Sequence, residues 1–214
     1  MLMYQNRTDA GEKLAEQLKD YQGKDTVVVA IPRGGIVVAA PIVEKIGAAL
    51  DLIIPRKVGT VTDPELAAGA ITPDGTVIYN EQLLAGRQIT AEDLKPIIDE
   101  EMAELKRRDQ VYRRDLRCKE IPGKTVIVVD DGMATGFTVL AALHALKNKK
   151  PSRLILAVPV AAREAVDLVS KAVDQVVCPA TPEPFFAVGQ FYNDFGQTTD
   201  EEVISIIKKL ESEI

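Results

Sequence analysis

The chain has 214 residues, with 26 lysines and arginines against 32 aspartates and glutamates and a single histidine, so its formal net charge is −6. This length allows one α/β domain with a substantial core. The acidic balance argues against general nucleic-acid affinity, one histidine excludes multi-histidine zinc sites, and two cysteines cannot build a disulfide framework. With no membrane-spanning apolar run and no signal-peptide pattern, we expect a soluble, cytoplasmic protein.

Short runs rich in valine and isoleucine alternate with helical patterns along much of the chain. Such continuous apolar runs are typical of strands covered on both faces in a parallel sheet. The predicted strands are residues 26–31, 50–55, 124–129, 153–158 and 174–178, and the predicted helices between them are 35–46, 137–146 and 161–169. This order predicts an α/β fold with a doubly wound, mostly parallel sheet.

Residues 56–79 interrupt this alternation because they are rich in glycine and proline. Two β-prone pieces, 67–71 and 76–79, predict a loop and a small hairpin. The turn of this hairpin is expected at Pro73-Asp74-Gly75.

A charged segment, residues 93–116, then shows helical spacing of apolar side chains, and Asp93 is its expected N-cap. We expect hairpin and helix to form an insertion at about 59–117 within one domain of residues 1–214. The basic side chains of this helix are expected to be a solvated face, with a homodimer contact as the alternative. They are Lys106, Arg107, Arg108, Arg113 and Arg114.

Aromatic residues gather in residues 179–197, before a last predicted helix at 200–210. This C-terminal segment, about 179–214, is expected to form a hood over the sheet. Phe185, Phe186 or Tyr192 could stack on a flat base there. The alternative is that these rings only close the core.

The clearest candidate site follows the third predicted strand, where residues 126–138 read Val-Ile-Val-Val-Asp-Asp-Gly-Met-Ala-Thr-Gly-Phe-Thr. Asp130 and Asp131 end the strand, and a Thr-Gly-x-Thr turn enters a helix. Backbone N–H groups and hydroxyls at such a helix start bind phosphate, while the carboxylates can bind sugar hydroxyls or Mg²⁺. This combination predicts a ribose 5-phosphate pocket, and a plain strand end with a helix cap is the alternative.

Residues 126–138 resemble the signature of the type I phosphoribosyltransferases, which bind 5-phosphoribosyl 1-pyrophosphate. Only Gly132 departs from the usual residue types, since an aliphatic residue or serine is common there. The resemblance implies that Asp130 and Asp131 bind the ribose hydroxyls and Mg²⁺. It implies that the other substrate contacts of this loop come from Met133, Ala134, Thr135, Gly136, Phe137 and Thr138.

The second candidate follows the first predicted strand, in Ile31-Pro32-Arg33-Gly34-Gly35. Two glycines let backbone N–H groups approach a ligand, and the Arg33 guanidinium suits phosphate oxygens. The segment is similar to the pyrophosphate loop of the same family, which often contains a cis peptide. A tight strand-to-helix turn with a solvated arginine is the alternative.

The third candidate is Arg56-Lys57, after the second predicted strand. Two cations beside a glycine- and proline-rich stretch are suited to hold a leaving pyrophosphate. With Pro64-Glu65, the stretch resembles the flexible loop that closes over the reacting centre in this family. The run from Arg56 to Ala70 also resembles an uncharacterised branch of predicted phosphoribosyltransferases, and a solvated pair of cations is the alternative.

The resemblance implies transfer of the 5-phosphoribosyl group to a nitrogen nucleophile, with release of pyrophosphate. Arg33, Lys57 and Mg²⁺ would stabilise the leaving group, while Asp130 and Asp131 would fix the sugar. Ala134 stands where members acting on 6-oxopurines usually have aspartate, which favours a different nucleobase. The expected partners are small molecules, without nucleic acid or membrane. The alternative function is a sensor that binds phosphoribosyl pyrophosphate without turnover.

Overall fold

The computed structural model describes residues 3–23, 25–64, 66–117 and 119–212. Within these residues five parallel strands form one sheet in the order β2-β1-β6-β7-β8. Their bounds are β1 Thr26–Ala30, β2 Ala49–Leu52, β6 Thr125–Val129, β7 Arg153–Ala157 and β8 Gln175–Val177. The expected mostly parallel α/β sheet is therefore confirmed.

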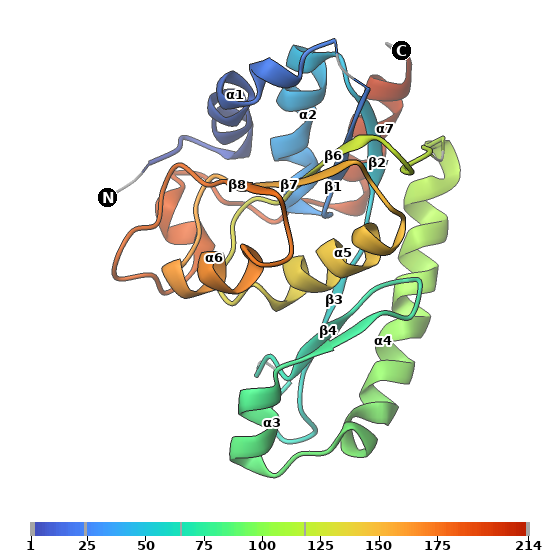
Figure 1. The fold of residues 1–214 in the computed structure, drawn as a ribbon, viewed down its shortest axis with the longest axis vertical. Helices are drawn as coiled ribbons and strands as arrows, with labels where there is room; N and C mark the ends of the chain where they lie inside the picture. Colours follow the sequence, from blue (N-terminus) through green and yellow to red (C-terminus); the bar gives the residue numbers. More distant parts are fainter. Residues whose placement is uncertain (1–2, 24, 65, 118, 213–214) are drawn as a thin grey trace.

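Alternate residues of each strand contribute to two different cores, because successive side chains of a strand point to opposite faces. Val28 and Ile127 pack in the core that includes α1, α2 and α7, whereas Val27 and Val126 pack with α5 and α6. Helices thus cover both faces of the sheet (Figure 1), as a doubly wound fold requires. Their bounds are α1 Arg7–Gln17, α2 Gly34–Ile46, α5 Phe137–Asn148, α6 Arg163–Val169 and α7 Asp200–Ser212.

The insertion leaves the main sheet after β2 and extends away from it (Figure 1). It holds an antiparallel sheet in the order β3-β4-β5, and Gly75, at a φ of 86°, lies in the turn between β4 and β5. The predicted hairpin is therefore confirmed. The insertion's elements are β3 Arg56–Val58, β4 Gly69–Ile71, β5 Val77–Tyr79, α3 Glu81–Arg87 and α4 Ala91–Tyr112, followed by the 3₁₀ turn η2 Arg113–Asp115.

Residues 3–5 run beside residues 191–194, although they are far apart in sequence. Tyr4 and Tyr192 form a parallel bridge, and the backbone N–H of Asn193 donates to the Tyr4 carbonyl at 2.9 Å. The hood-like segment expected from the C-terminal aromatics is thus joined to the segment before α1. Two further 3₁₀ turns are η1 Lys19–Tyr21 and η3 Val188–Phe191.

Several expectations about elements were wrong. The second strand ends at Leu52, and Arg56-Lys57, expected in a loop, begin the β3 strand of the smaller sheet. Asp93 is not the N-cap of the long helix, because Thr90 caps it and Asp93 accepts a hydrogen bond from the Thr90 backbone N–H at 2.8 Å in a capping box. Helices α1 and α3 were not predicted.

The basic face expected on the long helix is only partly solvated. Lys106, Arg107 and Arg114 are exposed, but Arg108 and Arg113 are half-buried. The Arg113 guanidinium reaches β2, where its Nη1 lies 2.6 Å from Oδ1 of the buried Asp51. This end of the helix is therefore fixed to the main sheet.

Candidate active site

The first part of the site is the loop between β6 and α5, residues 130–138, here called the signature loop. Gly136 precedes α5 with a φ of 82°, a backbone conformation that favours glycine. The loop borders a small, open cavity of about 140 Å³. The cavity is lined by Asp130, Gly132, Met133, Ala134, Thr135, Gly136, Thr138 and Val139. Asp130 and Thr135, predicted for the sugar and its phosphate, therefore share one cavity, and Phe137 begins the helix beside it.

The second part is the loop between β1 and α2, residues 31–35, here called the β1–α2 loop. The backbone N–H of Ile31 donates to the Val129 carbonyl at 2.9 Å, which places this loop beside the end of β6. Helix α2 begins at Gly34, and the Pro32–Arg33 peptide bond is cis, as the family resemblance implies.

The two loops lie in direct contact. A Cβ atom on Gly34 would lie 1.9 Å from Oδ2 of Asp131, and one on Gly35 would lie 2.8 Å from the Val129 carbonyl oxygen. Real side chains do not tolerate such distances, so only glycine lets the backbone come this close. The structure thus brings both loops together at the carboxyl edge of the parallel sheet, the place where ligands bind in such folds.

The Arg33 side chain does not join this contact. Its Nη1 lies 3.5 Å from Oδ1 of Asp200, which also accepts a hydrogen bond from the Tyr112 hydroxyl at 2.6 Å. The side chains that line the signature-loop cavity do not include Arg33. The backbone of the β1–α2 loop, and not the Arg33 guanidinium, therefore meets the aspartates in this structure.

Burial dominates the electrostatics of the acid pair. It raises the pKa of Asp130 well above its usual value, and the neighbouring Asp131 charge raises it further. Burial also raises the pKa of Asp131, while hydrogen bonding to Arg7 opposes the rise. Two desolvated carboxylates side by side favour a cation or hydroxyl donors. This donor set fits Mg²⁺, which proteins often hold through one or two carboxylates together with substrate phosphates.

Arg7 is a site residue that sequence reasoning missed. Its Nε donates to Oδ2 of Asp131 at 2.7 Å, and its Nη1 donates to the Gly196 carbonyl at 2.7 Å. Its guanidinium carbon also lies 3.8 Å from the centre of the Phe195 ring. No local pattern marks Arg7, because its partners are more than a hundred residues away in sequence.

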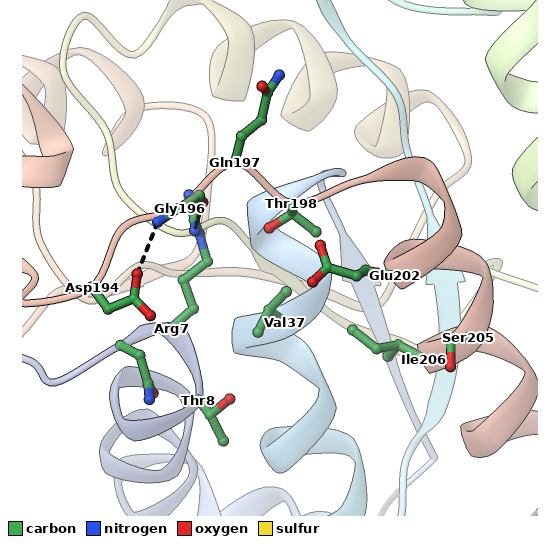
Figure 2. A pocket seen from close by; sticks show the side chains of 11 residues that line it. Arg7, Thr8, Val37, Asp194, Gly196, Gln197, Thr198, Glu202, Ser205 and Ile206 are labelled. Carbon is green, nitrogen blue, oxygen red and sulfur yellow. Dashed lines mark hydrogen bonds between the residues drawn. The ribbon is translucent and has the colours of Figure 1, made fainter.

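Arg7 also borders a cavity of about 400 Å³ between α1, α2, α7 and the segment before α7. Figure 2 shows Arg7 rising from α1 toward Gly196, with Glu202 and Ile206 of α7 across the cavity. The acidic side chains of Asp194 and Glu202 make this lining ill-suited to a phosphate.

Arg56 and Lys57 line a separate cavity of about 780 Å³ between β3, the loop that follows it and α4. Arg56 forms an ion pair with Glu101 of α4, so it is held within the insertion. Pro64 lies beside Gly59 at the rim, while Glu65 falls outside the described residues. The side chains that line the cavity of the signature loop include neither Arg56 nor Lys57.

The C-terminal aromatics divide into two groups. Phe191 and Tyr192 are buried, and the Tyr192 hydroxyl donates to the Asp131 carbonyl at 2.6 Å. Phe185 packs on Phe191 with ring centres 4.9 Å apart, whereas Phe186 is 82% exposed. Tyr192 is therefore joined to the signature loop, whereas Phe186 lines none of the cavities described above.

A doubly wound sheet with these two loops in contact at its carboxyl edge defines an α/β protein with a candidate ligand site at that edge. The sequence model of the phosphoribosyl transferase domain matches residues 2–194. The chain therefore belongs to the phosphoribosyltransferase family.

Individual relatives agree with this family. The Mycobacterium tuberculosis protein named "Putative phosphoribosyl transferase Rv0571c" is 37% identical over 209 residues, which is 98% of this chain and 47% of that protein. The chain thus spans about half the length of the curated relatives it matches. The crystal structure of TT1426 from Thermus thermophilus has a TM-score of 0.81 and 35% identity, covering 98% of this chain and 99% of that one.

More distant structures share the fold alone. A hypoxanthine phosphoribosyltransferase from Staphylococcus aureus has a TM-score of 0.50 at 18% identity, covering 86% of this chain and 78% of that one. Within the described residues, no helix is both long and apolar enough to cross a membrane.

Proposed function

We propose that this protein transfers the 5-phosphoribosyl group of phosphoribosyl pyrophosphate to a nitrogen nucleophile and releases pyrophosphate. The observation that carries the proposal is the contact of the two loops, since Gly34 touches Asp131 and Gly35 touches the end of β6. One loop has the acid pair and helix start suited to a ribose 5-phosphate. The other offers the backbone N–H groups of Arg33 and Gly34 to the diphosphate, while that of Gly35 donates to the Ile31 carbonyl. Family membership supports the same substrate.

Each loop has a separate task in this proposal. The carboxylates of Asp130 and Asp131 accept hydrogen bonds from the ribose hydroxyls and fix the sugar for in-line attack. Residues 134–138 hold the 5-phosphate through backbone N–H groups and the hydroxyls of Thr135 and Thr138. Residues 33–35 hold the pyrophosphate, and Arg33 reaches it only by leaving Asp200.

The chemical step breaks the bond between ribose C1 and the pyrophosphate oxygen while the nucleophile's nitrogen bonds to C1. Positive charge develops on the sugar and negative charge on the leaving group, so fixed donors at the β1–α2 loop lower the barrier. Mg²⁺ held by the acid pair and the substrate would neutralise part of the diphosphate charge. Lys57, with Arg56, is proposed to stabilise the leaving pyrophosphate, although both line the separate cavity of the insertion.

The acceptor is proposed to be a nucleobase other than a 6-oxopurine, because Ala134 provides no carboxylate at that position. The exposed face of Phe186 is the stacking surface for such a base.

The test is pyrophosphate release from phosphoribosyl pyrophosphate and Mg²⁺ with a panel of purine and pyrimidine bases. The double variant Asp130→Asn/Asp131→Asn is expected to stay folded and lose binding and turnover, while Asp167→Asn on the exposed side of α6 retains both. A double variant that binds normally would contradict the proposal. Binding without turnover for every base would instead identify a non-catalytic sensor.

A further inference from the structure

Arg7 joins three segments that are distant in sequence. Its guanidinium donates to the Asp131 carboxylate and to the Gly196 carbonyl, and it lies over the Phe195 ring. The Arg7 side chain is only 12% exposed and that of Asp131 only 17%. Because the pair is largely shielded from water, solvent and salt screen its attraction less than that of a surface ion pair.

The β1–α2 loop meets the same contact. A Cβ atom on Gly34 would lie 1.9 Å from Oδ2 of Asp131 and 2.7 Å from Nε of Arg7. The Tyr192 hydroxyl holds the other side of Asp131 through its backbone carbonyl. Asp131 is therefore fixed by residues outside its own loop, at the point where both substrate loops touch.

We propose that Arg7 is a positioning residue for the phosphoribosyl pyrophosphate site, which holds the Asp131 carboxylate against the β1–α2 loop and makes helix α1 part of the active site. This inference rests on the proposed function. Arg7 occupies Oδ2 of Asp131 and so fixes the direction of the carboxylate. Its positive charge also balances one of two adjacent buried carboxylates, whose repulsion would otherwise push the signature loop apart.

The guanidinium is suited to this task because its planar donors reach two acceptors in fixed directions. A lysine at this position keeps the charge, but its compact ammonium group cannot reproduce both directions. Arg7→Lys is therefore expected to restore part of what Arg7→Gln loses.

The experiment compares Arg7→Gln and Arg7→Lys with the control Lys45→Gln. Lys45 pairs with Glu16 at 2.8 Å, so the control removes an exposed link between α1 and α2 far from the loops. The first measurement is hydrogen exchange of the Asp131 and Met133 amides, which donate to Asp130 Oδ1 and to the Val160 carbonyl. The second is the affinity for phosphoribosyl pyrophosphate with Mg²⁺.

In Arg7→Gln we expect faster exchange at both amides and an affinity about 10- to 100-fold weaker. A loss of this size is typical when a residue that orients a metal-binding side chain is removed from other proteins. Arg7→Lys should be intermediate, and Lys45→Gln should match the wild type. Unchanged exchange and affinity in a folded Arg7→Gln would overturn the inference. If the wild type itself does not bind, the proposed function fails, and the exchange result alone decides whether Arg7 holds the loops.

Discussion

Single residues decide whether the two loops can meet. Asp130, Asp131 and the Thr-Gly-x-Thr turn were predictable because their spacing is local and their chemistry is evident from residue type. Arg7 was not predictable, since only the folded chain brings it to Asp131. The direction of the Arg33 side chain toward Asp200 was hidden for the same reason.

Gly34 gives the sharpest prediction at this scale. Gly34→Ala is expected to abolish binding of phosphoribosyl pyrophosphate, because the added methyl group would overlap the Asp131 carboxylate. The matched control is Gly86→Ala in α3, where nothing lies within 4 Å of the new atom and helix stability should rise by about 0.5–1 kcal/mol. Titration calorimetry and thermal unfolding of both variants test this, and normal binding by Gly34→Ala would refute the contact.

Asp130 gives a prediction about pH. Its folded-state pKa lies above the ordinary 3.8, so between these two values the folded state binds more protons than the unfolded state. The contribution of the Asp130 carboxyl to the free energy of unfolding is therefore greatest below about pH 3.8. It is lost as the pH rises through the pKa of the folded state.

Asp130→Asn removes this loss. The free energy of unfolding of Asp130→Asn minus that of the wild type should therefore increase as the pH rises from about 4 to about 7. Urea denaturation of both proteins at each pH measures this difference. A difference between the two proteins that does not change with pH would contradict the assignment.

At the scale of elements, the strands of the main sheet were predictable because buried parallel strands leave continuous β-branched runs. The start of the long helix was misplaced because Thr90 and Asp93 are both good capping residues, and only the backbone shows which one precedes the first turn. β3 was missed because Arg56 and Lys57 look like loop residues, although pairing with β4 makes them a strand. Helix α1 has a polar sequence whose burial comes mainly from contacts with α2.

The end of α4 is fixed to β2 through Arg113 and the buried Asp51. Arg113→Met should destabilise the protein by about 3 kcal/mol, because it leaves a carboxylate buried without its cation. Arg107→Met removes an exposed pair with Glu104 and should cost far less, because solvent screens that pair. Urea unfolding of both variants provides the comparison, and equal effects would show that the Arg113 pair does not fix the helix.

At the scale of the whole molecule, one sheet positions the substrate loops and a second, smaller sheet carries the cations Arg56 and Lys57 (Figure 1). The sequence indicated both parts but could not show how far apart their functional side chains lie. Each part lines its own cavity, so no shared cavity joins Arg56 and Lys57 to the signature loop among the residues that the structure describes.

The most direct test is a crystal structure of the protein with phosphoribosyl pyrophosphate and Mg²⁺. We predict the 5-phosphate at the backbone N–H groups of residues 134–138, the ribose hydroxyls at Asp130 and Asp131, and the diphosphate at residues 33–35. A ligand bound instead between β3 and α4, without contact to either aspartate, would contradict the claim that the two touching loops form one site.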